Sequence, residues 1–157
     1  MPKSKFKLTL KDEALDELMA QADHRTLGMW ARDCAERVMP YFEQAHPDDP
    51  RPRQALITLQ NWIDTGEFSM KVIRKASLDS HAAARDVGAD NPARSAARAA
   101  GQAVATAHVR THAVGPSLYA LQAIHRASND DTADEAIAKE RAWQSQRLMD
   151  LIAQEDN

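Results

Sequence analysis

The segment from Ala93 to Ala107 constrains the fold most, because more than half of its residues are alanine. Alanine has the highest intrinsic helix propensity, so the segment predicts a helix over about residues 92–113. Small side chains let neighbouring helices approach closely, and we expect this helix to pack tightly inside a bundle. The small residues recur four apart along one face, at Ala93, Ala97, Gly101 and Ala105.

The remainder of the chain also predicts helices, since its apolar residues recur at three- and four-residue spacing and no period-2 strand pattern is present. Pro40 predicts a kink or break, and Gly115-Pro116 predicts a turn. The expected fold is an all-α, single-domain bundle of about six to seven antiparallel helices with an Ala-rich core. Residues 1–8 are expected to form a flexible arm, and residues 9–157 the helical domain. The predicted helices cover about residues 10–21, 26–45, 50–65, 69–87, 92–113, 116–128 and 133–154.

Charge and cysteine content exclude several classes of protein. Twenty basic residues stand against 23 acidic residues, a balance that disfavours a nucleic-acid-binding protein. No uncharged run approaches the length of a membrane span, and the run from Ala99 to Val109 is also rich in alanine. Cys34 is the single cysteine, so no intrachain disulfide forms and a cytoplasmic location is expected. Its place in an apolar stripe favours a buried thiol over a nucleophile.

The histidines raise the question of a metal site. His108 and His112 are four residues apart, the spacing of helical metal ligands. Counting back from the predicted turn, His125 falls level with residues 105–108, so three imidazoles could converge on a metal ion. Histidines that bond to backbone carbonyls, or that lie at a subunit contact, explain the same residues without a metal. We expect no metal and no cofactor, with these three residues as the candidates if a metal is bound.

Other residues are candidates for polar or protein contacts. His81 and Arg85 share a helical face and could join His108, His112, Tyr119 and His125 in a polar cluster. Trp30 and Trp143 lie beside the strongest apolar stripes, where they either fill the core or anchor a protein interface. No glycine-rich phosphate loop or nucleophile elbow is present, so no catalytic residue is assigned.

Three segments together resemble a known family. They cover residues 29–56, 95–127 and 140–148, and the second contains the motif Ala-His-Val-Arg-Thr-His-Ala-Val-Gly at residues 107–115. Their combination is similar to the immunity-protein-five-like family of small bacterial helical proteins. The resemblance implies an all-helical cytoplasmic protein that binds and neutralises a toxin. His108, His112 and Tyr119 match the family pattern, which implies no catalytic residues.

Three functional hypotheses follow. The first is a non-catalytic immunity-type protein that covers a toxin by protein–protein contact, and this is the function we expect. The second is a helical homo-oligomer with a scaffold role, favoured by the alanine stripes and the off-stripe tryptophans. The third is a histidine-centred metal-binding protein or hydrolase. The expected partner is a protein, with neither nucleic acid nor membrane involved.

Overall fold

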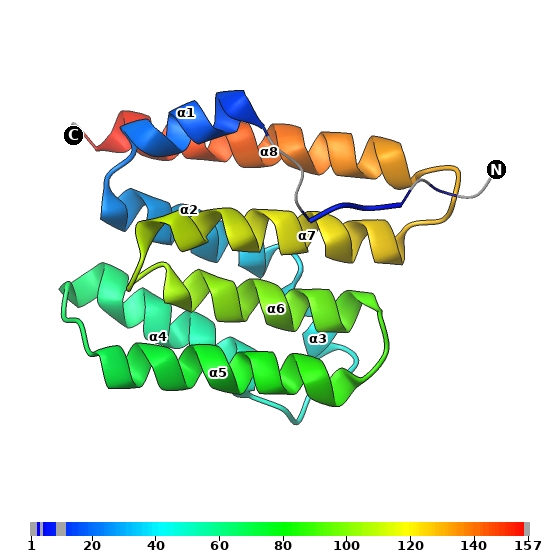
Figure 1. Cartoon of the computed structure of the whole chain (residues 1–157), viewed down its shortest axis with the longest axis horizontal. Helices are drawn as coiled ribbons and strands as arrows, with labels where there is room; N and C mark the ends of the chain where they lie inside the picture. The colour runs from blue at the N-terminus through cyan, green and yellow to red at the C-terminus, as the bar shows by residue number, and fades with distance from the viewer. Residues whose placement is uncertain (1–2, 4, 9–11, 156–157) are drawn as a thin grey trace.

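A computed structural model describes residues 3, 5–8 and 12–155 of the chain. Within these ranges the protein contains eight α-helices, one 3-10 helix and no strand, which confirms the predicted all-α bundle (Figure 1). The helices are α1 (Glu13–Gln21), α2 (His24–Glu36), α3 (Met39–Glu43), α4 (Arg51–Thr65), α5 (Met70–Val87), α6 (Pro92–Ala105), η1 (Arg110–Ala113), α7 (Val114–Ala127) and α8 (Ala133–Gln154). No described helix is long and apolar enough to cross a membrane.

Helix α6 is the centre of the bundle. It packs against α2, α3, α4, α5 and α7, and Figure 1 shows it between α5 and α7. A helix surrounded in this way needs apolar or small residues on nearly every side. Its buried residues are accordingly small: Ala93, Ser95, Ala96, Ala97, Ala99, Ala100, Gly101, Ala103 and Val104.

A second layer joins α2, α7 and α8, and α1 lies on α8 (Figure 1). Trp30 of α2 is fully buried, and its indole N–H donates to the carbonyl oxygen of Gln144 on α8 at 2.8 Å. The Gln144 amide donates in turn to the carbonyl oxygen of Ser117 on α7 at 3.0 Å. Both polar side chains are therefore satisfied inside the core, as buried polar groups must be.

Helix ends follow the local chemistry of the sequence. Side chains of Asp23 and Asn91 accept from the backbone N–H groups of Thr26 and Arg94, at 2.7 and 3.1 Å, and so cap α2 and α6. Gly66 ends α4 with a φ of 72°, a left-handed conformation that other residues adopt at a cost. These local signals explain why several helix limits were predictable.

One break agrees with the prediction and one turn corrects it. The predicted kink or break at Pro40 divides the segment 26–45 into two helices, because α2 ends at Glu36 and Pro40 lies in the first turn of α3, where no N–H donor is needed. Pro116 likewise lies in the first turn of α7, so Gly115-Pro116 is not the turn. The chain instead reverses between Ala105 and Arg110, immediately after α6.

The described part of the N-terminal arm lies along α7 (Figure 1). The Lys3 ammonium donates to the carbonyl oxygens of His125 and Ser128, at 2.6 and 3.0 Å, at the end of that helix. Phe6 packs on the His125 ring with centroids 5.7 Å apart. The predicted helix start at residue 10 lies outside the described residues, and α1 begins after Asp12. The flexibility of residues 1–8 stays a prediction.

A partly buried ion pair connects α8 with the end of α2. Arg37 donates through Nε and Nη2 to the two carboxylate oxygens of Glu140, at 2.6 and 2.8 Å. Glu140 is only 6% exposed, and the Arg37 guanidinium lies 3.9 Å from the ring centroid of Trp143. The bidentate geometry and the stacking both favour arginine over lysine at this position.

Replacing Arg37 should therefore destabilise the protein, because Arg37→Met leaves a buried carboxylate unpaired. The expected loss in free energy of unfolding is about 2–3 kcal/mol, less than for a fully buried pair, since the Arg37 side chain is 42% exposed. Lys75→Met is the control, because the Lys75–Asp79 pair lies on the surface and should contribute less than about 0.5 kcal/mol. Equal losses in urea unfolding of the two variants would contradict this account.

Candidate functional site

Exposed apolar side chains gather around the start of α5. Of the seven large hydrophobic residues that are exposed in the described chain, four lie between residues 68 and 78 and are 43–55% exposed. Clustered exposed apolar residues mark interaction sites more often than scattered ones do. We name this surface the α5 face, and it comprises Phe68, Met70, Val72 and Leu78 together with the cations Lys71, Arg74 and Lys75.

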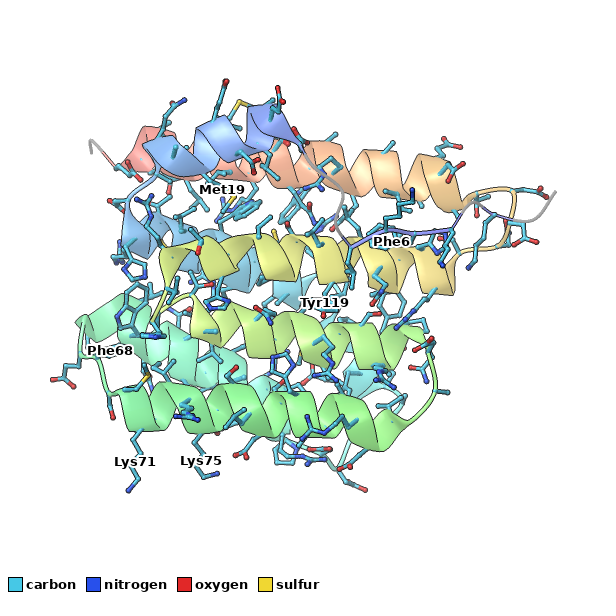
Figure 2. All side chains as sticks on the ribbon, in the orientation of Figure 1. Phe6, Met19, Phe68, Lys71, Lys75 and Tyr119 are labelled. Carbon is cyan, nitrogen blue, oxygen red and sulfur yellow. The ribbon has the colours of Figure 1, made fainter. Side chains whose placement is uncertain are left out.

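The exposure follows from how α5 packs. Its inward residues recur at three- and four-residue spacing and contact α4 and α6. Several of the residues between them point away from the bundle, and Figure 2 shows Lys71 and Lys75 extending into solvent. The inward set is Ile73, Ala76, Ser80, Ala83 and Ala84.

A groove of about 340 Å³ borders the α5 face. Met70, Arg74 and Leu78 line one side, and Gln102, His108 and His112 line the other. His108 is exposed and stacks against Phe68, with ring centroids 6.1 Å apart, while His112 donates from Nδ1 to Gln102 Oε1 at 3.1 Å. The groove therefore joins the α5 face to two of the predicted histidines.

The cations of the α5 face differ in their partners. Lys75 pairs with Asp79 at 2.5 Å. Lys71 and Arg74 make no ion pair with any residue that the structure describes. The face thus combines apolar side chains with two cations whose charges are not neutralised.

The three histidines proposed as metal candidates do not converge. Since α6 ends at Ala105, His108 lies in the turn and His112 in η1, so the two do not share one helix. His125 lies at the far end of α7, where the neighbouring Arg126 donates to Ser95 Oγ near the start of α6 at 2.9 Å. His125 was predicted to lie beside residues 105–108, and this was wrong because the chain reverses before Gly115. Among residues 3, 5–8 and 12–155, no three His, Cys, Asp or Glu side chains could hold a metal ion together.

His81, Arg85 and Tyr119 lie around one residue that the sequence analysis missed, Arg98. Arg98 donates from Nη1 to His81 Nδ1 at 2.8 Å, so this imidazole nitrogen carries no proton. Burial, together with the charges of Arg98 and Arg85, lowers the pKa of His81 to about 4. Tyr119 of α7 and Arg98 line the same small cavity. The sequence does contain a signal for Arg98, because a charged residue inside an alanine-rich, buried helix indicates a polar site.

The two tryptophans and the cysteine singled out in the sequence lie in the core or at its edge. Trp30 is fully buried and presents no surface to a partner. Trp143 is half-buried beneath the Arg37 guanidinium. Burial, with the nearby carboxylates of Asp33 and Glu140 adding to it, raises the pKa of the Cys34 thiol well above its usual value, so the thiol stays protonated and unreactive.

A family model described as "Imm-5 like putative immunity protein" matches residues 17–151. The chain belongs to this immunity protein family. No curated protein and no solved structure matches it. The matched range contains the whole α5 face, the adjoining groove and the Arg98 cluster.

The low pKa of His81 predicts that the stability of the protein depends on pH. Between about pH 6.5 and pH 4 the unfolded chain binds a proton at His81 that the native protein does not bind, so stability should fall as the pH falls through this range. His81→Asn keeps an acceptor for Arg98 but cannot titrate. Urea unfolding at about pH 7 and about pH 5 should show a smaller loss for this variant than for the wild type. The same loss in both proteins would contradict the prediction.

Proposed function

We propose that this protein is a non-catalytic immunity protein, which binds a bacterial toxin in the cytoplasm through the α5 face and blocks the toxin by direct contact. Membership of the immunity protein family is the observation that carries the proposal. The α5 face supports it with a surface suited to protein contact, since apolar side chains are flanked by charges. Alanine-rich packing elsewhere leaves few other large apolar side chains exposed in the described residues.

The chemistry of the α5 face indicates the kind of surface that it would contact. Val72 and Leu78 would lose solvent on binding, which is the main favourable contribution at the centre of an interface. Lys71 and Arg74 would pair with carboxylates at its rim and speed association. The proposed partner is therefore a toxin whose contact surface has apolar residues bordered by Asp or Glu.

The direct test is co-expression with the products of the adjacent genes. Wild-type protein should co-purify with one of these products and protect cells in which that product is toxic. Val72→Glu combined with Leu78→Glu places two carboxylates within the proposed interface, and affinity should fall by about a hundredfold. Met149→Glu is the matched control, because Met149 is an exposed apolar residue on α8.

Circular dichroism should show that both variants remain folded, because the substituted side chains are exposed. Protection and co-purification that survive the double substitution as well as they survive Met149→Glu would reject the α5 face. Co-purification of no adjacent gene product would reject the immunity function itself.

A second copy of the chain is the alternative occupant of the α5 face. Light scattering of the isolated protein separates the two proposals, since the immunity proposal predicts a mass near 17.4 kDa. A dimer that Val72→Glu combined with Leu78→Glu converts to monomer would assign the face to self-association.

A further inference from the structure

A small cavity between α6 and α7 is lined by three arginines. Its volume is about 250 Å³, and it lies on a different helix pair from the α5 face. Arg94 and Arg98 extend from α6, and Arg126, Tyr119 and Gln122 extend from α7. Figure 2 shows Tyr119 between these helices, next to the N-terminal arm that carries Phe6. We name this cavity the arginine pocket.

Positive charge in the arginine pocket is largely unneutralised. Arg94 and Arg98 donate to neutral acceptors, the carbonyl oxygen of Gly88 and the imidazole of His81, and make no ion pair with described residues. Asp90 is the single carboxylate among the lining residues. Its side chain is 78% exposed and forms an ion pair with Arg126 at 3.4 Å, so Arg94 and Arg98 are the cations without a described acidic partner.

Six of the ten other arginines in the described chain pair with a carboxylate, whereas two of the three that line the pocket do not. Arg37, Arg53 and Arg147 are examples of paired arginines. The absence of a described carboxylate partner beside Arg98 affects the pKa of its side chain. Burial lowers the pKa of its guanidinium, and the charges of Arg94 and Arg85 lower it further. A bound anion would relieve this repulsion.

Hydrogen bonds hold the α7 side of the pocket in place before any ligand binds. Arg126 donates to Ser95 Oγ at 2.9 Å, and Ser95 donates to Gln122 Oε1 at 2.8 Å. Ser95 is fully buried. Because the amide oxygen of Gln122 is occupied, its NH₂ group is the part of the amide that remains to donate to a ligand.

We propose that the arginine pocket binds a phosphate group, either inorganic phosphate or the phosphate of a small monoester such as a nucleotide. Three arginines and one aspartate leave two positive charges, which a phosphate dianion neutralises and a single carboxylate does not. Guanidinium groups bind phosphate oxygens through paired N–H donors. The Tyr119 hydroxyl and the Gln122 amide add neutral donors at the same cavity.

Isothermal titration of the full chain with potassium phosphate, in chloride buffer of constant ionic strength, tests the proposal. The expected result is one phosphate per chain, with sulfate competing for the same site. Arg98→Gln should weaken binding by about tenfold or more, because a charge-assisted hydrogen bond is lost. Arg74→Gln on the α5 face is the matched control and should bind as the wild type does.

Adenosine monophosphate forms a second arm of the experiment and identifies the source of the phosphate group. Tighter binding of the nucleotide than of inorganic phosphate assigns the pocket to a monoester, and equal or weaker binding assigns it to the free ion. Arg94→Gln is a second variant should Arg98→Gln fail to fold.

Three results would overturn the proposal: no heat of binding with wild-type protein, equal phosphate affinity in the Arg94, Arg98 and Arg74 variants, or equal binding of glutamate and phosphate. The last result would point to an acidic side chain of a protein as the occupant. No toxin takes part in these measurements, so the result is independent of the proposed immunity function.

Discussion

Close packing around α6 is the constraint on which the bundle depends. Five α-helices and η1 contact it, and its buried residues are no larger than valine. Such small side chains contribute little apolar area individually. The stabilisation comes from many short contacts made when backbones approach closely, because dispersion attraction falls steeply with separation. Larger residues along α6 would push α2, α4, α5 and α7 apart together.

The same packing positions both candidate sites. Because α5 lies so close to α6, a Cβ atom at Gly101 would be only 2.8 Å from His81 Nε2, so glycine makes room for the imidazole. His81 can then accept from Arg98 one turn earlier on α6. On its opposite side no described helix covers α5, which leaves Val72 and Leu78 exposed. One helix arrangement therefore produces an arginine pocket and an apolar face in separate places.

Local signals in the sequence predicted much of the fold and little of the sites. The limits of α4, α5 and α8 lie within about a residue of the prediction, since glycine, serine and proline act on their own neighbourhood. Gly115-Pro116 was misread because proline suits a turn and a first helical turn equally well. That error displaced His125 and produced the hypothetical three-histidine site. The α5 face could not be predicted, since Val72 and Ala76 look alike by periodicity and only tertiary packing decides which is exposed.

Unfolding of Ala100→Leu tests the central role of α6 most directly. Ala100 is fully buried, whereas Ala105 lies half-buried at the end of the same helix and at the edge of the groove. Our account predicts that Ala100→Leu loses about 1–3 kcal/mol of unfolding free energy through overpacking, while Ala105→Leu changes it by less than about 0.5 kcal/mol. Equal stabilities of the two variants would show that the helices around α6 are not closely packed at Ala100, and would contradict the account.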